Sequence, residues 1–256
     1  MIVIKNSHEI EAMKRAGYIA SVAREAAKRF LEAGTPGKMT TADVNREVEQ
    51  TIRRHHAIPT FLGYGGFPAS ACVSVNEEVI HGIPGERILR DGDLVKVDVG
   101  ATFDGFVGDC AATFFVGTPS ENAKRLAEVT RGAFYAAMQY ARPGYRISDI
   151  SHAVQEYAES RGCGVVRDYV GHGVGHRMHE DPEVPNYGNP GHGPRLIPGM
   201  TIAVEPMITE GTWKVKTLSN DWTVVTLDGK LAAHYENTIA ITTGDPMILT
   251  WSEMEI

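Results

Sequence analysis

Alternating apolar and polar positions predict a β-hairpin over residues 95–109. The three valines of residues 95–100 alternate with lysine, aspartate and glycine, which is the period-two pattern of a half-buried strand. Aspartate and glycine follow at 104–105, a strong signal for a two-residue turn. The sequence therefore predicts two antiparallel strands joined by a tight turn.

Two aspartates fall on one face of this expected hairpin. With the predicted turn, Asp98 lies opposite Ala111, and Asp109 is the next residue on the same face. Diagonal neighbours of this kind are roughly 7–8 Å apart at Cα. Two carboxylates so placed among valines repel each other unless a positive group lies between them, and a divalent cation is the economical answer. The alternative at this point is a pair of surface aspartates at the strand ends.

Apolar residues that recur at three- and four-residue intervals predict four amphipathic helices. N-capping residues precede the first three, and glycine or proline follows the helices where the pattern stops. The expected helices run from Ser7, as N-cap, to Gly34, from Thr40 to about His55, from Ser120 to about Tyr140, and through Ile150 to Gly162.

Composition places the chain among ordinary globular proteins. It has 256 residues, 43% of them hydrophobic and 22% charged, a size that one large α/β or α+β domain can occupy. The net charge of −7 argues against a direct nucleic-acid role. The three cysteines have no zinc or disulfide spacing, and no signal peptide or membrane-length apolar run is present. We therefore expect a cytoplasmic protein with reduced thiols and no membrane partner.

The second half of the chain repeats the first. Gly92–Asp98 matches Gly199–Glu205, so the acidic residues that end these two segments correspond. Asp109 and Glu236 are each followed by a strand-like segment and, eight residues later, by glycine. The second half carries an extra segment at roughly 212–230. A pseudo-twofold fold brings the two acid pairs together, which predicts a shared metal site.

A glycine-rich histidine segment, Gly171–Pro182, supplies candidate nitrogen ligands. His172 lies between two glycines, and imidazole completes a carboxylate-rich set for Mn²⁺, Fe²⁺, Co²⁺ or Zn²⁺. His179 is seven residues further on, so in a continuous strand it faces the other way. Both histidines reach one site only if the glycines allow the chain to bend.

A loop of glycines and aromatics at residues 61–67 has the composition of a pocket wall, although a packed loop fits it equally well. His81, which precedes glycine, is by itself typical of an ordinary loop histidine. An apolar pocket that ends in soft or aromatic groups suits a thioether.

The motifs found in order along the chain are Asn76–Pro84, Lys96–Ala101, Gly108-Asp109, Gly171–Pro182, Val204–Met207 and Tyr235–Thr238. Together they resemble the type I methionine aminopeptidases, which are metallopeptidases of the pita-bread fold. The resemblance covers essentially the whole chain. It implies an α+β fold in which a pseudo-twofold antiparallel sheet is covered by two helix pairs. It also implies a single catalytic domain over 1–256, with repeat halves of about 1–118 and 119–256.

The resemblance further implies removal of the initiator methionine from chains whose second residue is small. Two divalent ions (Co²⁺, Mn²⁺, Fe²⁺ or Zn²⁺) are expected on Asp98, Asp109, His172, Glu205 and Glu236, with Asp109 and Glu236 bridging. Glu205 is expected to act also as general base, His179 to polarise the scissile carbonyl, and His81 to hydrogen-bond the substrate near the amide. The expected methionine pocket consists of Tyr64, Phe67, Cys72, Met178 and Trp222.

The chain departs from the family pattern at several positions, and none of them removes a ligand. A small residue is usual at 61, Cys at 80, Ser or Thr at 110, Phe at 178 and Gln at 234; this chain has Phe61, Ile80, Cys110, Met178 and His234. These changes alter the shape of the pocket.

Two other functions stay open at this point. One is a proline-specific peptidase of the aminopeptidase P or prolidase type, and the other is a non-catalytic pita-bread protein that binds peptides. All five ligands are present, and the pocket composition favours methionine. The expected partners are peptides with N-terminal methionine and nascent chains. Lys214 and Lys216 in the extra segment are the basis for expecting ribosome association, and we expect a monomer.

Overall fold

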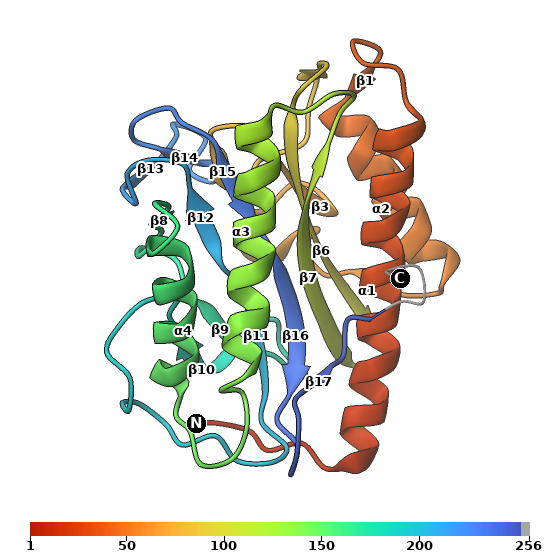
Figure 1. Ribbon diagram of the computed structural model, residues 1–256. Coiled ribbons are helices and arrows are strands. Elements are labelled where there is room, and N and C mark those ends of the chain that lie inside the picture. Colours follow the sequence, from red (N-terminus) through yellow and green to blue (C-terminus); the bar gives the residue numbers. More distant parts are fainter. Residues whose placement is uncertain (252–256) are drawn as a thin grey trace.

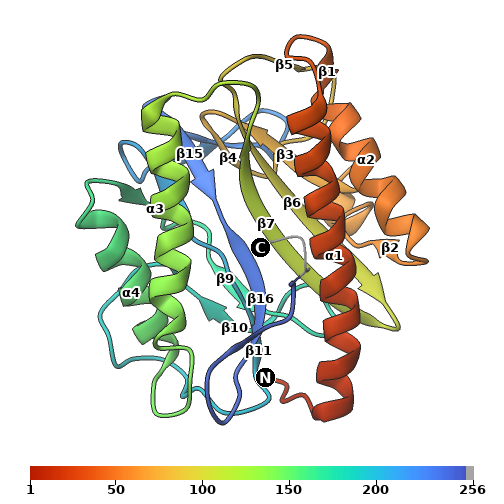
Figure 2. The same cartoon turned by 45° about the vertical axis from the view of Figure 1, so that its right-hand side comes forward.

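A computed structural model of the protein describes residues 1–251 (Figures 1 and 2). Two helix pairs lie against a central antiparallel sheet, and Figure 1 shows the red-to-orange pair on the right and the green pair on the left. The helices are α1 (Ser7–Ala33), α2 (Thr41–Arg54), α3 (Glu121–Met138) and α4 (Ile147–Glu159). The predicted α+β architecture with two helix pairs on an antiparallel sheet is confirmed.

The central sheet has nine strands. Its main path is β10 (Glu180–Val184), β9 (Gly171–Gly173), β11 (Thr201–Val204), β16 (Glu236–Ala240), β7 (Phe106–Phe115), β6 (Leu94–Phe103) and β2 (Ile58–Pro59). Two more strands join it at the side, β17 (Met247–Ile248) on β16 and β3 (Ala71–Val75) on β6.

Three small sheets surround the central one. They consist of β1 (Met39–Thr40) with β5 (Ile88–Leu89); β15 (Ala232–His234), β12 (Met207–Thr209) and β8 (Gly164–Val165); and β13 (Val215–Thr217), β14 (Val224–Thr226) and β4 (Glu78–Ile80). One 3₁₀ turn, η1 (Tyr64–Gly66), lies in the aromatic loop.

The hairpin of β6 and β7 has the predicted register. Asp98 pairs with Ala111, and Phe103 pairs with Phe106 across the two-residue turn. Both turn residues, Asp104 and Gly105, have positive φ (49° and 77°), as a type I′ turn requires. The right-handed twist of the strands selects this turn, so the aspartate–glycine pair fixes which residues share a face.

The two repeat halves meet at the centre of the sheet. β7 of the first half pairs antiparallel with β16 of the second, with Glu236 opposite Ala111. β6–β7 and β11–β16 therefore occupy corresponding positions on the two sides of this contact, and the β7 and β16 strands lie side by side in Figures 1 and 2. This is the arrangement that the repeat predicted.

Helix boundaries follow the predictions with small corrections. Asn6, not Ser7, is the N-cap of α1, because its side chain accepts from the backbone N–H groups of His8 and Glu9. Glu9 in turn accepts from the backbone N–H of Asn6, which completes a capping box. α3 ends at Met138, two residues earlier than expected. Thr40 and Ser120 cap α2 and α3 as predicted.

Helix α1 lies directly on the outer face of β6 and β7. A Cβ atom at Gly108 would lie only 2.4 Å from Cα of Gly17, so these two glycines allow the helix and strand backbones to touch. The valines of β6 are fully buried under α1 and α2. The opposite face of the sheet is thereby left for the acidic residues.

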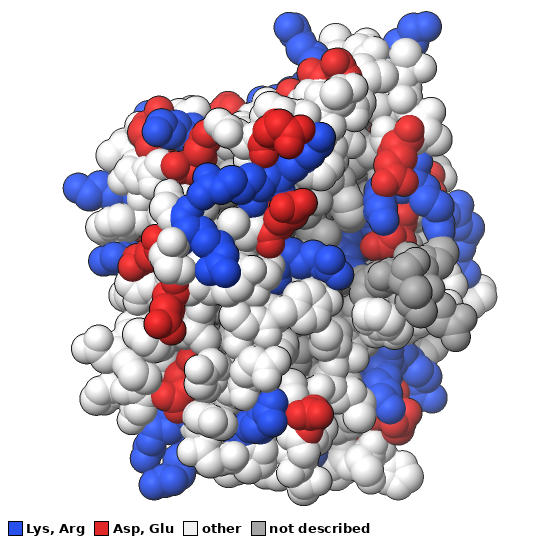
Figure 3. Space-filling view, viewed as in Figure 1, with Lys and Arg blue, Asp and Glu red and all other residues white. Residues whose placement is uncertain are grey.

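No helix among residues 1–251 is long and apolar enough to span a membrane. Across the face shown in Figure 3, the Lys and Arg side chains of the described residues are intermixed with Asp and Glu. Neither sign of charge forms a continuous field over this face.

Candidate metal centre and substrate pocket

Strand pairing places Asp98 and Glu236 in one row across the central sheet. Ala111 of β7 pairs with Asp98 of β6 on one side and with Glu236 of β16 on the other. Ala111 is fully buried and carries only a methyl group. The two carboxylates therefore lie on either side of a small side chain, which leaves space between them.

A second row contains Asp109, which lies two residues before Ala111 on β7. Its backbone is fixed by Thr238, whose Oγ1 donates to the Asp109 carbonyl (2.8 Å) and accepts from the Asp109 N–H (3.2 Å). Nε2 of His172, from β9, lies 3.5 Å from Oδ2 of Asp109 and 3.6 Å from Oε1 of Glu205. The five predicted ligands thus come together from five strands or strand ends.

The buried oxygen atoms of this cluster fit a divalent cation. Oδ1 of Asp98, Oδ1 of Asp109 and Oε1 of Glu236 are buried and have no hydrogen-bond partner within residues 1–251. Burial, reinforced by the charges of Asp109 and Glu205, raises the pKa of Asp98 and Glu236 well above the ordinary range. Burial and mutual repulsion destabilise the charged form of these carboxylates, and a bound cation would stabilise it.

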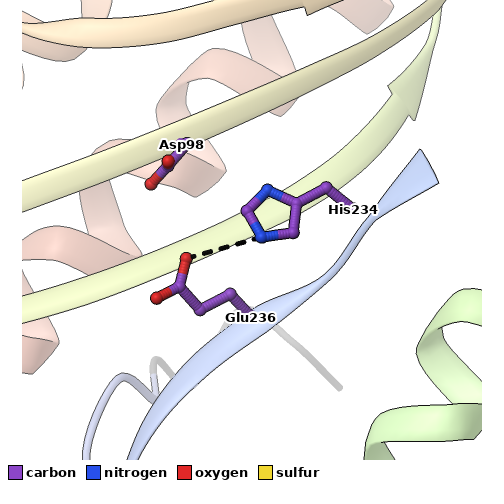
Figure 4. Close-up of side chains that lie close together, drawn as sticks. All are labelled: Asp98, His234 and Glu236. Carbon is purple, nitrogen blue, oxygen red and sulfur yellow. Dashed lines mark ion pairs between the residues drawn. The ribbon is translucent and has the colours of Figure 1, made fainter. Parts of the chain in front are cut away.

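Among the described residues, ligand atoms form two overlapping groups. One contains Asp109, His172 and Glu236, and the other contains Asp98, His234 and Glu236. Figure 4 shows the second group, in which the imidazole of His234 and the carboxylates of Asp98 and Glu236 point toward a common space. Glu236 belongs to both groups, so its carboxylate stands between them.

The protonation states of His172 and Glu205 are linked. Burial raises the pKa of Glu205 to about 8, although the charge of His172 opposes this. Burial by itself lowers the pKa of His172, but its hydrogen bond to Asp109 and the charge of Glu205 raise it to about 9. A cation bound by His172 must therefore displace a proton from its ring.

The chain between His172 and His179 turns back on itself, as the glycine-rich sequence predicted. β9 ends at Gly173, a loop follows, and β10 returns antiparallel. The ring centroids of His172 and His179 therefore lie 4.2 Å apart. The glycines act by close approach, since a Cβ at Gly173 would lie 2.2 Å from the carbonyl oxygen of Asp181. Neither Gly173 nor Gly175 has a positive φ.

His179 is a neutral imidazole in this environment. Burial and the neighbouring His172 lower its pKa to about 4. Its Nδ1 lies 2.6 Å from the hydroxyl of Tyr64, a residue of η1 in the aromatic loop. The aromatic loop therefore contributes a hydrogen bond to the histidine segment as well as apolar surface.

One pocket contains every residue predicted for the site. Its cavity has a volume of about 180 Å³. The rings of Phe67 and Trp222 line it side by side in an edge-to-face contact, with centroids 5.1 Å apart. The predicted residues that line it are Tyr64, Phe67, Cys72, His81, Asp98, Asp109, His172, Met178, His179, Glu205, Trp222 and Glu236.

His81 enters the pocket from the end of β4 in an uncommon backbone conformation. Its φ is +57°, a region that residues with a Cβ atom rarely adopt. The next residue, Gly82, is tied to β3 by its carbonyl, which accepts from the N–H of Val73 (2.9 Å). Burial lowers the pKa of His81, so its ring is neutral and faces the edges of Trp222 and Tyr169.

A sequence model of metallopeptidase family M24 matches residues 11–243. The chain belongs to metallopeptidase family M24.

Several relatives in family M24 match over nearly the whole chain. The methionine aminopeptidase of Clostridium acetobutylicum is 57% identical over 254 residues, covering 99% of this chain and 100% of the relative. Methionine aminopeptidase 1 of Bacillus subtilis is 49% identical over 250 residues, covering 98% and 99% of the two chains. The crystal structure of the methionine aminopeptidase from Thermotoga maritima is 47% identical, with a TM-score of 0.95 over 98% of this chain and 100% of that chain.

A prolidase from Pyrococcus furiosus is more distant, at 25% identity and a TM-score of 0.75, and the match covers 98% of this chain but 66% of the prolidase. The M24 relatives confirm the predicted resemblance to type I methionine aminopeptidases, the pita-bread fold and a metallo-aminopeptidase activity that uses divalent metal. They do not support the proline-specific or non-catalytic alternatives.

The structure adds five residues that the predicted site of this M24 chain did not include. Phe61 and Ile80 line the pocket, as do Tyr169 and Val170 just before the histidine segment. His234 lies beneath it, 3.7 Å from Glu236 through Nε2 and Oε2. A sequence signal for His234 exists, because residues two apart on a strand share a face and His234 is two residues before Glu236.

Proposed function

We propose that this chain removes N-terminal methionine from peptides and nascent chains whose second residue is small, with two divalent ions as cofactor. Co²⁺, Mn²⁺, Fe²⁺ and Zn²⁺ all suit a donor set of carboxylates and imidazole. The observation that carries the proposal is an apolar, aromatic-walled cavity that opens directly onto the cluster of Asp98, Asp109, His172, Glu205 and Glu236. Substrate specificity and hydrolytic chemistry are thus adjacent.

The metal ligands in this proposal are the five residues predicted from the sequence. Asp109 and Glu236 serve both ions, which agrees with the position of Glu236 in both ligand groups. His172 and Glu205 complete one position, and Asp98 contributes to the other. Bound ions supply Lewis-acid activation of water at neutral pH.

The surrounding side chains move protons and orient the substrate. Glu205, whose Oε1 lies 3.6 Å from His172, accepts the proton of the attacking water. His179, held neutral, donates a hydrogen bond to the scissile carbonyl oxygen. His81 faces the amide nitrogen from the end of β4. His179 therefore holds the peptide bond from the histidine segment, and His81 holds it from the end of β4.

The methionine side chain occupies the apolar part of the cavity. Its wall is formed by Tyr64, Phe67, Cys72, Met178 and Trp222. Aromatic edges and a thioether give favourable contacts to sulfur, each worth about 0.3–1.5 kcal/mol. The closed aromatic wall excludes longer or charged side chains by shape.

The test is peptide release with and without metal. After removal of divalent ions, we expect Mn²⁺ or Co²⁺ to restore release of methionine from Met-Gly-Met-Met and not to give cleavage of Ala-Pro-Phe. Glu205→Gln should abolish turnover, whereas Glu183→Gln, the same change at an exposed glutamate that does not line the pocket, is the control and should keep it. Cleavage of the proline peptide instead, or of neither peptide with any metal, refutes the proposal.

We also propose that residues 1–256 act as one catalytic unit that is monomeric and cytoplasmic and associates with ribosomes. Lys214 and Lys216 are exposed on the segment around β13 and support the last point. At low salt, the wild type should sediment with ribosomes and a Lys214→Glu/Lys216→Glu variant should not. Lys38→Glu/Arg90→Glu, which makes the same change of net charge at exposed positions elsewhere, is the control and should still sediment. Absence of the wild type from the ribosome pellet refutes this association.

A further inference from the structure

His234 is a buried imidazole that has no role in the proposed reaction. Its residue is only 1% exposed, and it lies at the end of β15, next to the carboxylates of Asp98 and Glu236 (Figure 4). We propose that His234 is a sixth metal ligand, which supplies an imidazole nitrogen to the ion held by Asp98 and Glu236. This inference rests on the proposed metal-dependent function.

The distances fit ligands of a shared cation better than hydrogen bonds. Nε2 of His234 lies 3.7 Å from Oε2 of Glu236 and 4.0 Å from Oε2 of Glu205, both beyond hydrogen-bond range. One ligand atom from each of His234, Asp98 and Glu236 falls within 4.8 Å of the other two. Nitrogen and oxygen ligands about 2.1 Å from one ion lie roughly 3.4 Å apart at a tetrahedral angle, so only a small adjustment is needed.

Both ring nitrogens of His234 are buried and lack a hydrogen-bond partner within residues 1–251. A buried polar atom without a partner is uncommon in folded proteins and calls for a ligand or ion. Oδ1 of Asp98 and Oε1 of Glu236, in the same group, are in the same condition. A single cation therefore accounts for three unpartnered groups at once.

Hydrogen bonds hold the backbone of His234 in a fixed position beside the row of Asp98, Ala111 and Glu236. Oγ1 of Thr113, on β7, donates to the carbonyl of His234 (2.8 Å) and accepts from its N–H (3.0 Å). On its other side, His234 pairs with Met207 of β12. Two neighbouring strands thus orient the ring toward the row that contains Ala111, and the imidazole needs little reorganisation to bind.

An imidazole changes which ions this position prefers. Without His234 the ligands of the position are carboxylates alone, which suit harder ions such as Mn²⁺ and Mg²⁺. A nitrogen ligand favours Co²⁺ and Zn²⁺ over Mn²⁺. We therefore expect His234→Gln, which removes the imidazole and keeps a polar side chain, to weaken Co²⁺ binding at one of the two positions by about 10- to 100-fold. Mn²⁺ binding should change much less.

The direct test counts imidazole ligands. In the Co²⁺-loaded protein, each metal-bound histidine gives a hyperfine-shifted ring N–H signal in proton NMR. We expect two such signals in the wild type, from His172 and His234, and one in His234→Gln. His192→Gln, a change at an exposed histidine outside the site, is the matched control and should keep both signals. Calorimetric titration with Co²⁺ and Mn²⁺ gives the affinities of the same three proteins.

X-ray absorption of the wild type loaded with two Zn²⁺ or Co²⁺ ions provides a measurement that needs no variant. It should report one imidazole per ion on average if His234 binds, and half that number if it does not. One imidazole signal in the wild type, or equal Co²⁺ affinities for wild type and His234→Gln, overturns the inference while leaving the proposed function intact. A wild type that binds no divalent ion at all overturns the proposed function itself.

Discussion

The hydroxyl of Tyr64 lies 2.6 Å from Nδ1 of His179, and the two rings are 5.4 Å apart. Burial raises the pKa of Tyr64, so the phenol keeps its proton, and His179 is neutral because its pKa is about 4. A phenol that donates to Nδ1 leaves the imidazole proton on Nε2. We infer that the phenol is the donor in this pair, so that Tyr64 selects the tautomer that can donate to a substrate carbonyl.

Replacing Tyr64 with phenylalanine should lower kcat more than it raises KM. The ring that lines the pocket is kept, whereas the hydrogen bond that fixes the tautomer of His179 is lost. We expect kcat to fall by about 10- to 100-fold, as for other residues that orient a functional histidine. The measurement is steady-state release of methionine from a Met-Gly peptide at saturating metal.

Tyr18→Phe removes a hydroxyl from an exposed tyrosine of α1 and is the control for a general effect of this change. An unchanged kcat in Tyr64→Phe shows that the tautomer of His179 does not depend on this hydroxyl. A change confined to KM assigns Tyr64 to substrate binding alone.

The edge-to-face pair of Phe67 and Trp222 forms part of the apolar lining of the pocket. In Trp222→Ala the pocket loses this wall, so KM for methionine peptides should rise by about 10-fold and peptides with a bulkier first residue should become relatively better substrates. Competition between Met-Gly and Phe-Gly peptides measures the ratio of kcat/KM values.

Trp213→Ala is the matched control, because Trp213 is in the same extra segment and packs beside Arg167 outside the pocket. Equal loss of activity in both variants indicates that the segment is disturbed as a whole. An unchanged ratio of substrates in Trp222→Ala means that other residues set the limit on size.

The hairpin, and the meeting of the five candidate ligands in one place, could be predicted from the sequence because their signals are local and repeated. Alternating valines and an aspartate–glycine turn specify the register of β6 and β7, and hence that Asp98 and Asp109 share a face. The same acidic positions recur in the second half. Two matching halves constrain a fold more strongly than either alone, since the pairing of β7 with β16 follows from their symmetry.

Other parts of the site depend on contacts that no local pattern specifies. Trp222 reaches the pocket because β14 pairs with β4, a strand about 145 residues earlier in the chain. Short three-residue strands carry little periodic signal, so this pairing could not be read from residues 212–230. The hydrogen bond between Tyr64 and His179 likewise depends on how two loops meet.

Ala111 lies between Asp98 and Glu236 in the row across the central sheet, and its methyl group leaves the space between the two carboxylates open. Valine at this position would place two more methyl-sized groups among them. We expect Ala111→Val to weaken divalent-ion binding by at least about 100-fold, and to cost about 1–3 kcal/mol of stability from overpacking. Calorimetric titration with Co²⁺ measures the first effect and urea unfolding the second.

Ala112→Val is the control on the same strand. Ala112 packs into the core under α1 and α2, on the other face of the sheet, so the variant should lose comparable stability and keep its metal affinity. If both variants lose metal affinity equally, the effect comes from strain in β7. If neither variant loses metal affinity, the space between the carboxylates of Asp98 and Glu236 is large enough to hold both a valine side chain and the metal.

Lys5 and Glu180 form a buried ion pair that joins the N-terminal segment to the histidine loop. Nζ of Lys5 lies 2.6 Å from Oε2 of Glu180, and the side chains are only 2% and 4% exposed. Burial alone would raise the pKa of Glu180, but hydrogen bonds from Lys5 and from the N–H of Arg177 lower it below its ordinary value of 4.5. The carboxylate is thus stabilised in the charged form.

Lys5→Met leaves this carboxylate buried with its main partner removed, which should cost about 3–5 kcal/mol at pH 7. In the wild type the folded pKa of Glu180 is depressed, so the stability it contributes is present above pH 4.5 and is lost as the pH falls through the folded pKa. In Lys5→Met no lysine opposes the effect of burial, which therefore raises the pKa of Glu180. Acid then protonates Glu180 and removes the cost of a buried, unpaired carboxylate. The difference in unfolding free energy should therefore be largest near pH 7. It should shrink as the pH falls from the raised pKa of Glu180 in the variant, above 4.5, through its depressed pKa in the wild type, below 4.5.

Urea unfolding at a series of pH values measures this difference. Lys14→Met, which breaks the exposed Lys14–Glu11 pair, should cost at most about 0.5 kcal/mol at any pH, because solvent screens such pairs. A loss in Lys5→Met that stays constant with pH would mean that packing of the lysine stem, and not the charge of Glu180, carries the stability. If the unfolding free energies of wild type and Lys5→Met converge in acid, the buried carboxylate of Glu180 is the source of the loss, because its protonation removes the unpaired charge.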